Sequence, residues 1–213
     1  KAVNINPTFS KKYRQLDLYN KYRTFGSKYE GLGIAYFIQE DYNNSKENFL
    51  KEININKNNS YPYTIIGIIN SIISDNEDSS NYFNKSIELD MKNTHALIQK
   101  GMFLRKLNKL NSSVIYFNDA IDLAPSNLYY QAELAKTYML LKKYNRSIFI
   151  LNQIIKKEPN ADYFYEILGL VYSKLLNYNE SEKNFKKAIQ LNKYNYNSLI
   201  ALSNTYSIQN KTN

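Results

Sequence analysis

The chain has 213 residues, a formal net charge of +9, and hydrophobic residues at 43% of its positions. These values are ordinary for globular proteins and predict a sizeable buried core. The sequence contains no Cys and a single His, which excludes disulfide frameworks, thiolate zinc sites, cysteine nucleophiles and two-histidine metal or catalytic sites. We therefore expect neither a metal nor a cofactor. A chain without Cys suits reducing and oxidising compartments alike, so cytoplasm and cell envelope both stay open.

Residues 1–25 are expected to form an N-terminal segment with one amphipathic helix over residues 10–23, out of phase with everything that follows. The most apolar run of the chain, residues 64–73, is much shorter than the roughly 20 residues that a membrane-spanning helix needs. We therefore expect no membrane span, although contact with a membrane surface stays open.

From Gly26 onward the sequence repeats with a period of 34 residues and no insertion. The predicted repeats are 26–59, 60–93, 94–127, 128–161 and 162–195, followed by a terminal helix or cap at 196–213. The eighth position of each window is small, as a close crossing of two helices requires: Gly33, Gly67, Gly101, Ala135, Gly169 and Ser203. The twenty-fourth position is bulky and mostly aromatic: Phe49, Phe83, Phe117, Leu151 and Phe185. Apolar residues recur at helical spacing in segments of about a dozen residues, which predicts two helices per repeat.

This order of aromatic, Leu, Gly and Tyr in a first helix, then small, Phe and Ala in a second, resembles the tetratricopeptide repeat. The resemblance extends over residues 26–209 and implies an all-α fold, a right-handed α-solenoid of antiparallel helix pairs. The sequence departs from the pattern at Asn70, Lys100 and Gln131 in first helices, and at Glu52, Ser86 and Ile154 in second helices. These departures affect local packing and not the fold.

A recurring turn separates the two predicted helices of a repeat. Its sequence is Tyr-Asn-x-Ser or Leu-Asn-x-Ser, with Asn at positions 43, 111, 145 and 179. An Asn side chain accepts hydrogen bonds from free backbone N–H groups, so we interpret each Asn as the N-cap of the second helix. The same residues also match the Asn-x-Ser glycosylation pattern.

In the resembled family, the first helices line a concave groove that holds peptides or protein segments. The resemblance implies that the groove-facing positions are the second, fifth, sixth, ninth, twelfth and thirteenth. The candidate partner-binding residues are Ile34, Phe37, Ile38, Tyr61, Ile65, Ile68, Ile72, His95, Met102, Tyr129, Lys136, Met139, Tyr163 and Leu170. Their apolar character is greatest in the first two repeats. An exposed apolar stripe of this kind marks a binding site, and the alternative is that the helix at 10–23 covers the groove.

One use of the family fold is the capture of a chaperone's C-terminal carboxylate, for which repeats carry Lys at the fifth position and Asn at the ninth. Here the fifth positions hold Glu30, Thr64, Ile98, Ala132 and Glu166, and the ninth hold Ile34, Ile68, Met102, Lys136 and Leu170. The carboxylate clamp is therefore absent. His95 stands without a catalytic motif beside it, which favours a role as a polar contact.

Positive charge concentrates in residues 1–25 and in the third and fourth repeats, whereas the first two repeats are acidic. The predicted function is a non-enzymatic scaffold or adaptor whose apolar, aromatic groove holds a segment of a partner protein. One alternative is a structural assembly factor that acts through its convex face or its ends. A basic surface rich in tyrosines leaves a nucleic-acid adaptor as a weaker alternative. Partner, compartment and oligomeric state do not follow from the sequence.

Overall fold

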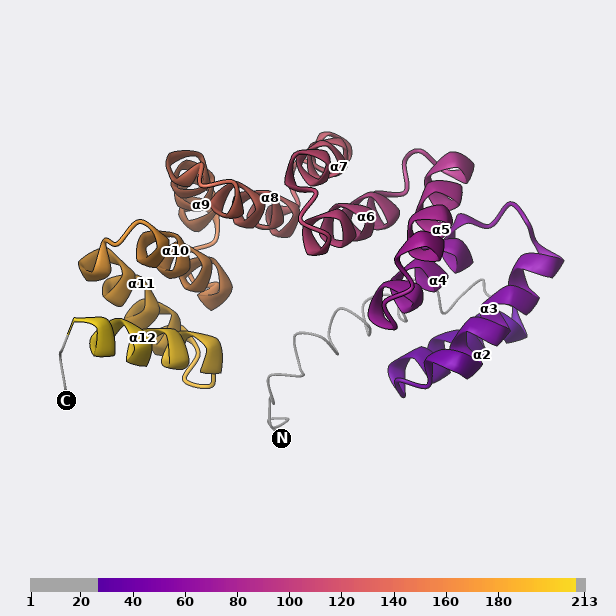
Figure 1. Ribbon diagram of the computed structural model, residues 1–213, viewed down its shortest axis with the longest axis horizontal. Coiled ribbons are helices and arrows are strands. Elements are labelled where there is room, and N and C mark those ends of the chain that lie inside the picture. Colours follow the sequence, from indigo (N-terminus) through magenta and orange to yellow (C-terminus); the bar gives the residue numbers. More distant parts are fainter. Residues whose placement is uncertain (1–26, 210–213) are drawn as a thin grey trace. The chain divides into compact units, whose positions relative to one another are not determined.

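The computed structural model describes residues 27–209, which form eleven helices and contain no strand. The out-of-phase helix predicted at 10–23 lies outside these residues. The helices are α2 (Lys28–Ile38), α3 (Tyr42–Ile55), α4 (Ser60–Ile72), α5 (Asn76–Leu89), α6 (Thr94–Lys106), α7 (Leu110–Leu123), α8 (Leu128–Leu140), α9 (Tyr144–Lys157), α10 (Asp162–Lys174), α11 (Tyr178–Leu191) and α12 (Tyr196–Ile208). The predicted all-α solenoid fold of paired helices is confirmed (Figure 1).

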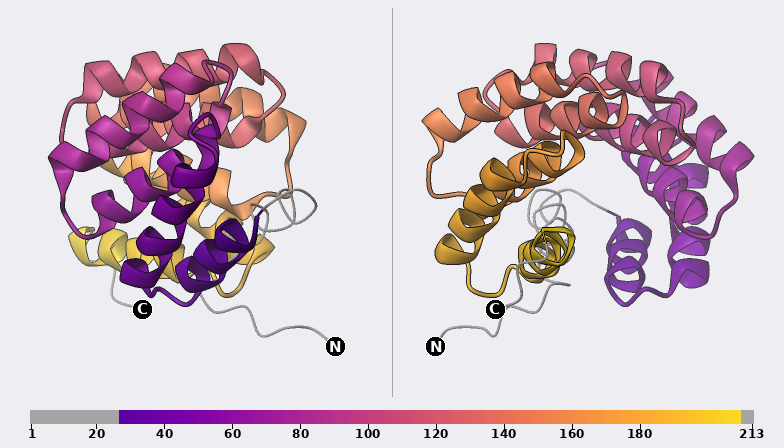
Figure 2. Two further views of the ribbon diagram at one scale, coloured as in Figure 1. Left: turned by 90° about the vertical axis from the view of Figure 1, so that its right-hand side faces the viewer. Right: turned by 60° about the vertical axis from the view of Figure 1, so that its left-hand side comes forward.

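The described helices fall into two compact units, α2–α6 and α7–α12. In the N-terminal unit, α2 packs on α3, α4 packs on α5, and α6 contacts both α4 and α5. In the C-terminal unit, α8 packs on α9 and α10 on α11, while α12 contacts α10 and α11. Figure 2 shows the paired helices from two further sides. The division of the chain into five repeats of 34 residues stays a prediction.

Three of the helix pairs, α2–α3, α4–α5 and α10–α11, cross with a glycine against a phenylalanine ring. A Cβ atom added to Gly33, Gly67 or Gly169 would lie 2.9, 2.8 or 2.6 Å from the ring of the Phe sixteen positions later. The serine of the Asn-x-Ser turn stabilises the same crossing, because its hydroxyl donates to the carbonyl of the small residue. These bonds measure 2.8 Å for Ser45 to Gly33 and 3.0 Å for Ser181 to Gly169. These hydrogen bonds give the serine of the turn a role at the helix crossing that the N-cap interpretation of the turn did not include.

The turn between paired helices has a left-handed residue where glycine would be expected. The residues with positive φ are Glu40, Ser74, Asn108, Lys142 and Leu176, which recur at the repeat period. The next backbone N–H reaches back across this residue, as from Asp41 to Tyr36 O at 3.0 Å and from Asn177 to Tyr172 O at 2.9 Å. This 6→1 hydrogen bond of a Schellman motif ends the first helix in one turn.

The N-cap interpretation of the turn asparagines is wrong. The second helices begin two residues earlier than expected, so each Asn is the second helical residue. The side-chain caps are instead Asp41, Asp75 and Asn177, whose oxygens accept from the N–H three residues later. The left-handed residue turns the chain so sharply that the residue directly after it, and not the Asn, takes the capping position.

Three of the polar departures from the repeat pattern, Asn70, Ser86 and Lys100, are buried and form hydrogen bonds. Asn70 accepts from Lys46 at 2.9 Å, Ser86 donates to Ser60 O at 2.8 Å, and Lys100 donates to Asn84. These hydrogen bonds offset part of the cost of burial. The Nδ2 atom of Asn70 is buried and has no hydrogen-bond partner among the described residues.

Candidate protein-binding face

The first helix of each pair lies next to the first helix of its neighbour within a unit. α4 contacts α6, and α10 contacts both α8 and α12. The surface formed by α2, α4 and α6 is called the N-terminal face below, and the surface formed by α8, α10 and α12 is called the C-terminal face. All of the candidate residues lie on these helices.

On the N-terminal face, four candidate residues are buried. Ile34, Phe37, Tyr61 and Ile65 belong to one core cluster, and Ile65 is only 1% exposed. Ile38 and Ile68 pack against this cluster and are partly exposed, and Ile72 is exposed. A ligand can therefore touch only some of the apolar candidate residues on this face. The accessible apolar surface lies around Ile68 and Ile72.

Helix α6 adds two candidate residues to the N-terminal face. His95 and Met102 are both partly exposed. The Nε2 atom of His95 lies 3.3 Å from the side-chain nitrogen of Gln99, one helical turn later. This contact suits the predicted polar role of His95.

On the C-terminal face, the structure brings three candidate residues into direct contact. The rings of Tyr129 and Tyr163 stack with centroids 6.1 Å apart and planes 26° apart. The Nζ atom of Lys136 lies 5.7 Å from the centre of the Tyr163 ring, a cation–π distance. The remaining two candidates here, Met139 and Leu170, are partly exposed. This face therefore combines accessible apolar surface with a fixed cation.

A buried carboxylate holds the cluster together. The side chain of Glu133 is fully buried, and its Oε1 atom accepts a 2.5 Å hydrogen bond from the Tyr163 hydroxyl. Lys136 Nζ lies 3.3 Å from the same Oε1 atom and 3.3 Å from the Tyr163 oxygen. A buried charge needs such partners because loss of water contacts is costly. The group joins α8 to α10 and fixes the orientation of Tyr163.

A second acidic group lies nearby, on α10. Asp162 Oδ2 accepts from Asn192 and Asn195, both at 2.9 Å, and Glu166 Oε1 accepts from Asn197 at 3.3 Å. Burial raises the pKa of Glu166 above its ordinary value, and Asp162 adds to the increase, while Asn195, Asn197 and Lys136 oppose it. Glu166 is thus a partly buried carboxylate whose hydrogen-bond partners are neutral amides.

The N-terminal unit contains another buried acidic pair, away from the accessible part of its face. Glu30 and Glu52 are both buried; Glu30 accepts from Asn59 at 3.3 Å, and Glu52 accepts from Ser27. Burial raises the pKa of Glu30, and repulsion from Glu52 raises it further. The sequence marked Glu52 only as a departure from the expected Ala. A second Glu at the fifth position of the same repeat was the signal that could have identified the pair.

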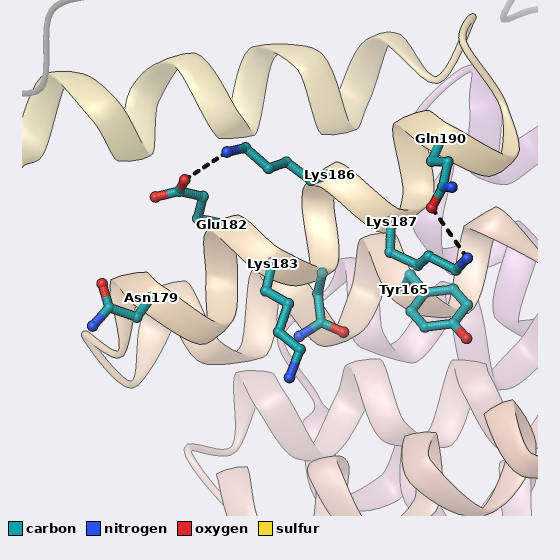
Figure 3. Close-up of a pocket in the computed structure, with 8 residues that line it drawn as sticks. Tyr165, Asn179, Glu182, Lys183, Lys186, Lys187 and Gln190 are labelled. Atoms are coloured by element: carbon teal, nitrogen blue, oxygen red, sulfur yellow. Dashed lines mark hydrogen bonds and ion pairs between the residues drawn. The ribbon is translucent and has the colours of Figure 1, made fainter.

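A separate hollow of about 780 Å³ lies between α10 and α11, outside the two faces (Figure 3). Its lysines have partners on their own helix. Lys186 pairs with Glu182 at 2.8 Å, and Lys187 donates to Gln190 at 3.2 Å, as the dashed lines in Figure 3 mark. Tyr165 lines the hollow from α10. The positive charge of Lys186 is therefore balanced by Glu182, and the Lys187 ammonium group has a polar partner.

Two further observations apply to residues 27–209. No group of three or more His, Asp or Glu side chains is arranged to hold a metal ion in this part of the chain. None of its helices combines the length and the hydropathy needed to cross a bilayer.

The family model of the tetratricopeptide repeat matches residues 94–127 and 163–195. No curated protein matches the chain. Several solved structures share its fold. PilW, a type IV pilus biogenesis factor, superposes with a TM-score of 0.78 at 13% identity, over 86% of this chain and 86% of PilW. PilF of Pseudomonas aeruginosa gives a TM-score of 0.72 at 14% identity, over 94% of this chain and 87% of PilF.

A third similar structure is YrrB, described as a tetratricopeptide protein with an unusual peptide-binding site. Its TM-score is 0.63 at 13% identity, over 88% of this chain and 96% of YrrB. Identities this low demonstrate a shared fold. The repeat phase, the glycine–phenylalanine crossings and these comparisons agree: the chain contains tetratricopeptide repeats at 94–127 and 163–195 and has the fold of tetratricopeptide repeat proteins.

Proposed function

We propose that the chain is a non-enzymatic scaffold that holds a segment of a partner protein on the faces formed by its first helices. The carrying observation is the cluster of Tyr129, Tyr163 and Lys136 beside partly exposed Met139 and Leu170. Aromatic rings offer large contact area at a small loss of side-chain entropy, and rings held in place before binding lose less still. The buried bond from Tyr163 to Glu133 provides that fixation.

The fold supports the same proposal. Tetratricopeptide repeat proteins are generally protein-interaction scaffolds, and the description of YrrB names a peptide-binding site. The proposal assigns no chemical step to the chain. Glu133, Lys136 and Asp162 of the C-terminal face are engaged in contacts within the unit, and a fold alone does not imply a function.

The test is affinity capture from a native cell lysate with three versions of the chain. The face variant carries Ile72→Glu and Leu140→Glu, which place charges on exposed residues of α4 and α8. The matched control carries Ile115→Glu and Phe149→Glu, on exposed residues of the second helices α7 and α9. Circular dichroism and thermal melting first establish that all three versions fold equally well.

The proposal predicts a protein that the unmodified chain and the control retain and the face variant loses. Equal retention by all three versions would contradict it. If only the control variant failed to retain the protein, the binding surface would lie on the second helices.

One observation favours a second candidate, assembly through α12. Its eighth residue, Ser203, is exposed, and so are Leu199 and Ile200, whereas the corresponding Gly169 of α10 is covered by Phe185. An uncovered apolar helix face suits association with another chain. Sedimentation across a range of concentrations tests it. Leu199→Glu should then weaken self-association, and a monomer at every concentration would count against this role.

A further inference from the structure

The charges of the C-terminal face are unevenly compensated. Glu133 has Lys136 and the Tyr163 hydroxyl as partners, so its charge is neutralised within the unit. Asp162 is satisfied by two amide groups at 2.9 Å. Glu166 forms no ion pair with any residue of 27–209, and its contact to Asn197 is 3.3 Å long. Lys136 acts on its charge only from a longer range. The least compensated negative charge of the face is therefore at Glu166.

Apolar surface surrounds this carboxylate. Tyr163 and Leu170 lie on the same helix as Glu166, one turn before and one turn after it, and both are partly exposed. Ile200 occupies on α12 the position that Glu166 has on α10, and it is 63% exposed. A ligand that reaches Glu166 thus meets aliphatic and aromatic side chains beside the amide of Asn197. Lysine and arginine suit such a place because their stems lie along apolar surface while their heads meet a carboxylate.

The face itself shows that it can hold an ammonium group. Lys136 lies between the Tyr163 ring and a Glu carboxylate, a combination of cation–π and charge-assisted contacts. Glu166 lies one helical turn after Tyr163 on α10, so a second cation at Glu166 would also meet a carboxylate close to an aromatic side chain. Charge complementarity therefore favours a cationic ligand over an acidic one, in contrast to the carboxylate clamp.

We propose that Glu166 receives a lysine or arginine side chain of an extended partner segment, with an apolar neighbour of that residue packed on Leu170 and Ile200. This inference rests on the proposed function and names the chemistry of its partner. It follows that the partner segment carries a basic residue at the position that meets Glu166, although the C-terminal unit itself is rich in lysine.

Because the partner is unidentified, the test uses phage-displayed random nonapeptides selected on the immobilised full chain. The expected outcome is enrichment of Lys or Arg at one position, next to an apolar residue. The best peptide is then synthesised with a fluorescent label, together with a version in which Met replaces the basic residue. Fluorescence anisotropy measures the dissociation constant of each peptide for the unmodified chain, Glu166→Gln, Glu158→Gln and Leu140→Glu.

Glu166→Gln should weaken binding of the basic peptide about tenfold and leave the Met peptide unaffected. Glu158→Gln, on an exposed residue at the end of α9, should change neither. Affinity for the unmodified chain should also fall as the pH drops from 7 toward 4.5, because protonation of Glu166 removes the charge. This dependence should vanish in Glu166→Gln.

An acidic or wholly apolar consensus, the absence of any selected peptide, or equal affinity of the chain and Glu166→Gln would overturn the inference. Binding that Leu140→Glu abolishes without any preference for a basic residue would refute the inference alone and leave the proposed function standing. Binding unaffected by both variants would contradict the two together.

Discussion

The Tyr163 hydroxyl of α10 donates a 2.5 Å hydrogen bond to the fully buried carboxylate of Glu133 on α8. The bond joins neighbouring first helices through the residue whose ring stacks on Tyr129. Because Glu133 is inaccessible to water, it depends on Tyr163 and Lys136 for its stability. The same contacts that hold the unit together therefore orient its aromatic surface.

Removing the Tyr163 hydroxyl should destabilise the fold. Tyr163→Phe leaves the Glu133 carboxylate with fewer donors, and we expect the free energy of unfolding to fall by about 1–3 kcal/mol. Tyr165→Phe is the matched control, because Tyr165 lies on the same helix and its hydroxyl has no hydrogen-bond partner among the described residues. Urea unfolding followed by circular dichroism compares the two. Equal stability of both variants would mean that the bond contributes nothing.

Two glycine substitutions should change the stability of the fold in opposite directions. Gly169→Ala places a methyl group 2.6 Å from the Phe185 ring, so the helices α10 and α11 must separate. We expect a loss of about 1–3 kcal/mol from overpacking. Gly31→Ala, on α2, meets no atom within 4 Å and should gain about 0.5–1 kcal/mol through helix propensity. Thermal melting of both variants measures the difference, and a neutral Gly169→Ala would refute the close crossing.

The left-handed turn residues predict a stabilising change. Leu176 has φ of 62° and is exposed, so Leu176→Gly relieves backbone strain without loss of core contacts. The expected gain is about 1 kcal/mol, reduced by the greater freedom of glycine in the unfolded chain. Leu175→Gly, at φ of −82°, should destabilise instead. If the two variants shift the melting temperature in the same direction, the turn geometry is not the cause.

The Glu30–Glu52 pair predicts a pH-dependent stability. Because burial and Glu52 raise the pKa of Glu30 above its ordinary 4.5, the folded state binds this proton more tightly than the unfolded chain does. Glu30 therefore destabilises the fold at neutral pH, and stability is regained as the pH falls toward 4.5. Glu30→Gln should be more stable than the unmodified chain at pH 7.

The gain from Glu30→Gln should shrink at pH 5, where Glu30 itself is closer to neutral. Glu158→Gln is the control, because Glu158 is exposed at the end of α9 and should show neither effect. Urea unfolding at the two pH values provides the comparison. If the stability gained by Glu30→Gln were larger at pH 5 than at pH 7, the assignment of a raised pKa to Glu30 would be contradicted.

The fold was predictable from the sequence because its geometry demands particular residues at fixed spacing. A glycine such as Gly67 is needed wherever a ring such as Phe83 crosses within contact distance, and that demand recurs with every repeat. The capping residues were misplaced by two positions, because the sequence does not reveal that Glu40 or Leu176 adopts positive φ. Residues other than glycine rarely take that conformation.

The candidate face was less predictable. Periodicity places Ile65 and Ile68 on the same face of one helix. It does not distinguish the buried Ile65 from the partly exposed Ile68, because core and groove residues are both apolar. The Glu133–Tyr163 bond depends on the side-chain conformations of two helices thirty residues apart. A repeat frame gives the position of each residue and not its hydrogen-bond partner.

The most direct test of binding on the first helices is photo-crosslinking in the native cell. A benzoylphenylalanine residue replaces Leu140 on α8 in one version and Phe149 on α9 in another; the two residues are 48% and 66% exposed. Illumination, denaturing purification and mass spectrometry then identify any attached protein. We predict that position 140 attaches to a partner protein and position 149 does not. Attachment from position 149 alone, or from neither position, would contradict the central claim.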